Sequence, residues 1–151
     1  MRPRIERTRK GEVVVRLPEE ERELLRTLPE QLRQLLRSDD PSLFRLFPPA
    51  YGEDEEANAA YDELVRGDLL EGRLEALRVL EETAGAKRLD EEQLAAWIGA
   101  LNDFRLVLGT RLDVTEEVYS TSVSPRDPRA PELALYGYLT WLQEQAVRAT
   151  S

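Results

Sequence analysis

Hydrophobic residues recur at intervals of three and four along most of the chain, which is the spacing of one face of an α-helix. Four long segments and one short turn are therefore predicted to be helical: 18–37, 42–47, 54–84, 91–108 and 131–148. Pro29 should kink the first segment without ending its apolar register, and Gly67 and Gly72 should bend or split the third. The pattern predicts a mainly α fold, a single-domain bundle of about five helices.

The first seventeen residues have the pattern of a β-hairpin. Val13 to Val15 are β-branched, and Gly11 can adopt the positive φ of a tight turn. A lone hairpin is marginal in water, so it should pack on the helices. We expect one domain over 1–151, divided into the hairpin, a helical core, a loop and a C-terminal helix: 1–17, 18–112, 113–130 and 131–149.

The helix that begins near residue 91 has the clearest end signals. Asp90 followed by Gln93 approximates a capping box, and Gly109 is the predicted stop. Gly85 is the predicted C-terminal cap of the preceding helix.

An arginine, Arg105, interrupts the apolar stripe of this helix. The stripe consists of Leu94, Trp97, Ile98, Leu101, Phe104 and Leu108. A buried guanidinium is costly unless it is paired, so we expect a structural ion pair between helices. Glu132 is the candidate partner, since it lies with Gln143 on the apolar face of the last helix, and Asp103 or a carboxylate of the middle helices is the alternative. A binding or catalytic role for Arg105 is the other interpretation.

Three residues of the last helix lie outside its apolar stripe, namely Trp141, Tyr138 and Leu133. Exposed aromatic residues grouped with apolar neighbours often bind a protein partner, and such a face would also suit a homodimer. The alternative is that a second layer, such as the hairpin, covers this face.

The composition narrows the chemistry that this chain can perform. It contains neither cysteine nor histidine, so it has no thiol nucleophile, no Ser/His triad and none of the usual zinc ligand sets. Lys10 and Lys87 are the only lysines. We therefore expect a non-enzymatic protein without catalytic residues, cofactor or metal.

Charge is unevenly distributed along the chain. The formal net charge is −9, which opposes non-specific binding to nucleic acid. A basic N-terminal arm nevertheless provides candidate DNA contacts, at Arg2, Arg4, Arg7, Arg9 and Lys10. These arginines alternate along a strand and could equally pair with the acidic helices. No signal peptide or membrane span is evident, so the expected location is cytoplasmic.

The sequence resembles the actinobacterial oxidative-stress transcriptional regulators, a family long described only as a domain of unknown function. The resemblance rests on "LDEEQLAAWIGALNDFRLVLGTRLDVTEE" and on "DPRAPELALYGYLTWLQEQAV", with support from "GEVVVRLPEEERELLRTLPEQL" and "AYGEDEEANAAYDELVRGDL". It spans nearly the whole chain.

The resemblance implies a transcriptional regulator that contacts a sigma factor or the transcription machinery, since no helix-turn-helix is recognisable. The expected contact surfaces are the Trp141 face and the loop at 114–130. Direct DNA binding and an interaction adaptor unrelated to transcription are the alternatives. The absence of cysteine is a departure, because thiol oxidation cannot sense an oxidant within this chain.

Overall fold

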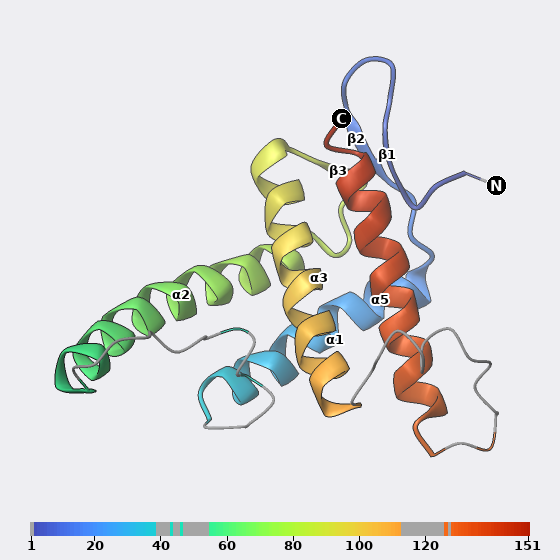
Figure 1. Ribbon diagram of the computed structural model, residues 1–151. Coiled ribbons are helices and arrows are strands. Elements are labelled where there is room, and N and C mark those ends of the chain that lie inside the picture. Colours follow the sequence, from blue (N-terminus) through green and yellow to red (C-terminus); the bar gives the residue numbers. More distant parts are fainter. Residues whose placement is uncertain (1, 39–42, 44–45, 47–54, 113–125, 127) are drawn as a thin grey trace.

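The structure is a computed structural model that describes residues 2–38, 43, 46, 55–112, 126 and 128–151, without the side chains of 55–66. Within these residues the chain forms four helices and a small antiparallel sheet (Figure 1). The helices are α1 (Glu19–Leu36), α2 (Glu55–Thr83), α3 (Glu91–Arg111) and α5 (Ala130–Arg148), and the strands are β1 (Ile5–Arg7), β2 (Val13–Val15) and β3 (Arg88–Leu89). The prediction of a mainly α fold is confirmed, although the described helices number four and not about five.

The helix α3 occupies the centre of the bundle. It packs against α2 on one side and against α5 on the other, and α1 packs against α2. Figure 1 shows α3 and α5 side by side, with the sheet at the end where α3 begins and α5 ends. The sheet and the C-terminal end of α5 are thus brought together although they lie at opposite ends of the sequence.

The sheet contains the predicted hairpin and one additional strand. Ile5 pairs with Val15 across β1 and β2, and Gly11 has the expected positive φ of 87° in the turn. The strand β3 pairs with β2 through Val13 and Leu89. Sequence reasoning missed β3, because two residues between helices are too few to show an alternating pattern.

The junction between the sheet and the helices is held by the side chain of Arg22 in α1. Its guanidinium donates to the carbonyl oxygens of Leu17, Ala84 and Ala86 at 2.9 Å, and to that of Val15 at 3.3 Å. One side chain therefore satisfies backbone acceptors at the end of β2, where the chain leaves the sheet, and before β3, where the chain returns to it.

The predicted end of α3 and the predicted split of α2 are wrong. The helix α3 continues through the buried Gly109 to Arg111, and α2 is one unbroken helix across Gly67 and Gly72, where a bend stays a prediction. A helical glycine costs only about 1 kcal/mol, which the burial of Val107 and Leu112 outweighs in α3. The helix α1 passes Pro29 without a break, as the continuing apolar register predicted, and the kink there stays a prediction.

The predicted start of α3 is confirmed. The Asp90 carboxylate accepts from the Gln93 backbone at 2.7 Å, and the Gln93 side chain accepts from the Asp90 backbone at 2.9 Å. Of the predicted turn at 42–47 the structure describes Leu43 and Leu46, both buried in the core. The predicted loop lies largely outside the described residues, at 113–125 and 127.

The core contains one buried ion pair. Asp103 of α3 is 2% exposed and pairs with Arg73 of α2, whose Nη2 also donates to the Leu46 carbonyl at 3.1 Å. Burial raises the pKa of the Asp103 carboxyl, and this effect exceeds the lowering by Arg73.

No helix in the described part of the chain is long and apolar enough to cross a membrane.

Replacing the buried carboxylate alone should be costly. Asp103→Ala removes the buried carboxylate that pairs with Arg73, and we expect a loss of about 3 kcal/mol in the free energy of unfolding, measured by urea denaturation. The double variant Arg73→Met/Asp103→Leu should recover most of this loss, since neither charge is then left behind. Equal losses for the single and double variants would contradict the account.

Candidate functional site

The N-terminal strand is attached to α5 by the side chain of Gln145. This residue is 6% exposed, and its Oε1 accepts from the backbone N–H groups of Arg4 at 2.5 Å and of Ile5 at 3.2 Å. The acceptor satisfies two donors at the start of β1, one of which belongs to the buried Ile5. Gln145 thereby sets the position of Arg4 on the surface of α5.

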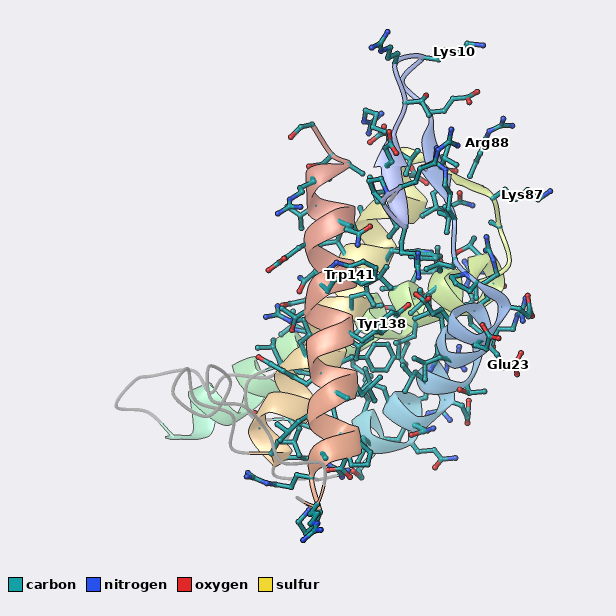
Figure 2. The ribbon with its side chains drawn as sticks, turned by 90° about the vertical axis from the view of Figure 1, so that its right-hand side faces the viewer. Lys10, Glu23, Lys87, Arg88, Tyr138 and Trp141 are labelled. Carbon is teal, nitrogen blue, oxygen red and sulfur yellow. The ribbon has the colours of Figure 1, made fainter. Side chains whose placement is uncertain are left out.

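Arg4 joins an aromatic pair on the outer side of α5. Its Nη2 lies 3.1 Å from the Glu21 carboxylate of α1, and its guanidinium carbon lies 5.7 Å from the centre of the Trp141 ring. The Tyr138 and Trp141 rings are tilted, with centroids 6.0 Å apart. Figure 2 shows both rings on α5. We call Arg4, Glu21, Tyr138 and Trp141 the Trp141 surface.

The four side chains of the Trp141 surface hold one another in place. The Tyr138 hydroxyl donates to Glu21 Oε1 at 2.7 Å, so one carboxylate accepts from both Tyr138 and Arg4. Burial and the neighbouring Glu21 carboxylate raise the pKa of the Tyr138 phenol. Tyr138 is thus a protonated donor near neutral pH, while Trp141 is 40% exposed to solvent.

The three predicted partner-binding residues differ in how exposed their side chains are. Trp141 is exposed, Tyr138 is half-buried beneath the Arg4 and Glu21 contacts, and Leu133 is buried at 6% exposure. The expectation that Leu133 belongs to an exposed face is wrong. Because α5 is covered by α3 and by β1, counting a single apolar stripe underestimates what this helix buries.

The predicted ion pair between Arg105 and Glu132 is also wrong. Arg105 donates from Nε to Thr140 Oγ1 at 3.0 Å and from Nη1 to Gln143 Oε1, and it lies over the Tyr136 ring. Within the described part of the chain it forms no ion pair, and Glu132 is exposed. Arg105 is only half-buried, so neutral acceptors and water can replace a counter-ion. The alternative partner, Asp103, pairs with Arg73.

The basic arm is partly occupied by contacts within the molecule. Besides Arg4, Arg7 donates to the Ala149 carbonyl at 2.7 Å, to the Gly11 carbonyl at 2.8 Å and to Glu91 at 2.6 Å. The remaining candidates for DNA contact, Arg2, Arg9 and Lys10, are exposed. The prediction that arginines of this arm pair with acidic residues of the helices is therefore confirmed for Arg4 and Arg7.

Sequence reasoning missed Gln145 and Glu21, which organise the surface. A signal for Gln145 was present, since this amide lies next to Ala146 and three residues after Leu142 on the buried face. For Glu21 no signal distinguished it from the other acidic residues in the first turn of α1.

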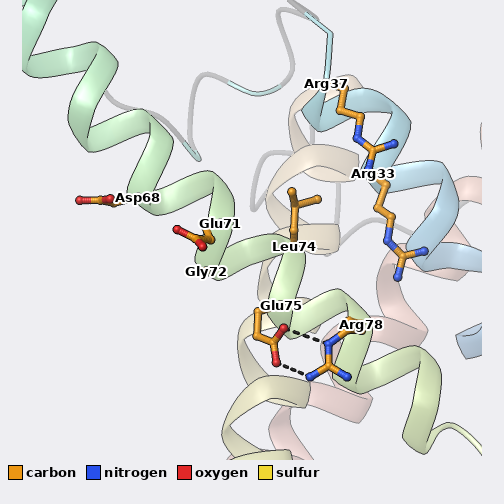
Figure 3. Close-up of a pocket in the computed structure, with 8 residues that line it drawn as sticks. All are labelled: Arg33, Arg37, Asp68, Glu71, Gly72, Leu74, Glu75 and Arg78. Atoms are coloured by element: carbon orange, nitrogen blue, oxygen red, sulfur yellow. Dashed lines mark hydrogen bonds and ion pairs between the residues drawn. The ribbon is translucent and has the colours of Figure 1, made fainter.

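A separate cleft of about 760 Å³ lies between α1 and α2. Arg33 and Arg37 project from α1, and the acidic side chains come from α2 (Figure 3). The hydrogen bond from Arg78 lowers the pKa of Glu75, so this carboxylate is ionised and a poor proton acceptor. Among the described residues, no group of three or more acidic side chains is arranged to hold a metal ion.

The fold and the site define a small, mainly helical domain with a half-exposed tryptophan held by an arginine. The chain belongs to the family described as a domain of unknown function (DUF2017), whose sequence profile matches residues 1–150. The resemblance inferred from the sequence is thereby confirmed. No solved structure matches the chain significantly.

The chain is similar to mycobacterial proteins that carry regulator names. It is 32% identical over 128 residues to the putative oxidative stress regulator AosR of Mycobacterium leprae (strain TN), which covers 74% of this chain and 58% of the relative. It is 31% identical over 125 residues to the oxidative stress regulator AosR of Mycobacterium tuberculosis (strain ATCC 25618 / H37Rv), which covers 72% and 57%. The chain thus spans less than two thirds of the length of these relatives.

The attachment of the N-terminal strand can be tested at Gln145. Gln145→Met removes the acceptor for the Arg4 and Ile5 amides, and we expect their hydrogen exchange to accelerate about tenfold or more, corresponding to about 1–3 kcal/mol for an unsatisfied buried donor. Gln143→Met is the matched control, because its side chain accepts from Arg105 and not from the strand. Unchanged exchange in Gln145→Met would show that the strand is held by other contacts.

Proposed function

We propose that this protein is a non-enzymatic regulator of transcription that acts through protein contact, with the Trp141 surface as the contact site. The regulatory part of the proposal is supported by the names of the mycobacterial relatives. The contact part is supported by one observation, the 40% exposed Trp141. Exposed, pre-positioned aromatic residues often carry much of the binding energy in protein interfaces.

The Trp141 surface is suited to binding because its side chains are already ordered. Arg4 and Tyr138 restrict the rotation of the Trp141 ring, so little conformational entropy is lost when a partner covers it. Glu21 already neutralises Arg4, which avoids burying an unpaired charge in the interface. A partner surface with an apolar pocket and a polar rim would complement this arrangement.

The finer part of the proposal concerns the partner, which we infer to be a sigma factor or another component of the transcription machinery. Its support is the regulator function named for the relatives, together with the net charge of −9, which disfavours broad contact with DNA. Thiol oxidation within these 151 residues cannot be the sensing step of the stress response named for those relatives, because the sequence has no cysteine.

The non-enzymatic part of the proposal rests on the chemistry of the side chains. Histidine and cysteine are absent from the sequence, and in the cleft between α1 and α2 Glu75 is engaged by Arg78. The cavity beside Arg105 is lined by one carboxylate, Glu144, so it offers no convergent carboxylate pair for acid and base catalysis.

Removing the exposed aromatic ring should weaken partner binding without unfolding the protein. We expect Trp141→Ala to reduce capture of transcription proteins from the native host at least tenfold, corresponding to about 1.4 kcal/mol or more. The readout is affinity capture with quantitative mass spectrometry. Leu69→Ala is the matched control, since Leu69 is a similarly exposed apolar residue on α2. Recovery of no transcription protein by the wild type would overturn the proposal.

A second candidate function, direct DNA binding, is favoured by the charge of the sheet. Residues 2–17 and 87–88 contain eight Lys or Arg residues and two Glu residues. Figure 2 places Lys10, Lys87 and Arg88 at this same end of the molecule. A local positive potential of this kind can attract phosphate even on an acidic protein.

DNA binding by the sheet should be strongly dependent on salt. Affinity for duplex DNA should fall by about tenfold or more between 50 and 200 mM salt, and Arg9→Glu/Lys10→Glu should abolish it, because these exposed residues provide charge without supporting the fold. The measurement is fluorescence anisotropy, with Arg37→Glu as a control at a distant exposed arginine. Binding that survives Arg9→Glu/Lys10→Glu would rule out this use of the sheet.

A further inference from the structure

Arg105 has hydrogen-bonding capacity that its contacts within the molecule do not use. Thr140 and Gln143 accept from Nε and Nη1, and both acceptors are neutral. In the described residues Nη2 has no acceptor and the guanidinium has no carboxylate partner. Besides these acceptors and the Tyr136 ring, the half-buried positive charge has no counter-ion in the described residues, and it is held in a defined orientation.

This guanidinium borders a cavity of about 380 Å³ between α3 and α5. The cavity is lined by Arg105, Thr140, Gln143, Glu144, Val147 and Arg148. Arg148 is exposed and, within the described part of the chain, forms no ion pair. Two arginines and one carboxylate thus line the cavity, which has the size of a site for a small ligand.

We propose that Arg105 and Arg148 form a binding site for a single carboxylate group. A carboxylate has two coplanar oxygens that match the edge of a guanidinium, and its one negative charge balances the net charge of the cavity. Val147, which is 47% exposed, supplies an apolar wall for the aliphatic part of the ligand. A doubly charged phosphate fits less well, because Glu144 repels it more strongly.

Glu144 does not itself fill the site. It lies one helical turn before Arg148, yet the two form no ion pair, and Glu144 is exposed. Its negative charge in the cavity lining predicts that it weakens binding of an anion. This effect separates a binding role for Arg105 from a purely structural one, since stabilising α3 against α5 does not involve Glu144.

The test is a titration of the folded full chain followed by the side-chain Nε–Hε signals of arginine in ¹H–¹⁵N NMR spectra. One arm uses butyrate, a free acid with one carboxylate, and the other an N-acetylated, C-amidated tetrapeptide with one glutamate. We expect the Arg105 signal to shift and saturate with a Kd of about 1 mM or more. Arg148→Gln should weaken binding at least threefold, and Glu144→Gln should strengthen it about twofold or more.

The two arms identify the source of the carboxylate, and either source supports the site. Tighter binding of the peptide would assign the site to an acidic side chain of a protein, and equal or tighter binding of butyrate would assign it to a free small acid. Arg37→Gln is the charge-matched control and should leave both titrations unchanged.

The inference is overturned if neither ligand shifts the Arg105 signal, or if the Arg37 signal shifts equally. It is also overturned if Glu144→Gln leaves the affinity unchanged. Because no partner protein is needed, failure here would leave the proposed function standing, and recovery of no transcription protein by the wild type would leave this site standing.

Discussion

The buried pair of Asp103 and Arg73 is the interaction on which the arrangement of the helices depends. It lies where α3 packs against α2, and Arg73 also reaches the carbonyl of Leu46, so three segments meet at one guanidinium. An ion pair of this kind gains little net free energy over a well-packed apolar pair, but a charge left without its partner is costly. The pair therefore disfavours other registers between α2 and α3 more than it adds stability.

Three arginines inside the fold illustrate three ways of satisfying a guanidinium. Arg73 has a buried carboxylate, Arg22 has backbone carbonyls, and Arg105 has two neutral side-chain acceptors. The contacts of Arg73 hold α2 against α3, and those of Arg22 hold α1 against the sheet. The third arrangement leaves a charge beside a cavity, which is the basis for proposing Arg105 as part of a ligand site. The same residue type thus serves structure or binding according to its acceptors.

The surface separates charge in a way that the overall net charge of −9 conceals. Basic residues gather on the sheet, while the helices carry most of the acidic ones. The Trp141 surface lies between these regions, where Arg4 of the N-terminal segment meets Glu21 of α1. A protein partner that covered Trp141 would therefore contact both a basic and an acidic neighbourhood, and charge complementarity could set its orientation.

The sequence by itself determined the helical class, the hairpin with its Gly11 turn, the capping box at Asp90 and the family, because these depend on local spacing and residue type. The tertiary structure alone decided which side chains meet. Arg105 donates to Gln143 and does not pair with Glu132, Asp103 pairs with Arg73, and Gln145 accepts a hydrogen bond from the N-terminal segment. Helical periodicity defines which residues share a face, whereas pairing depends on how faces from distant segments are rotated against each other. That rotation is set by packing of the whole core and has no local signature.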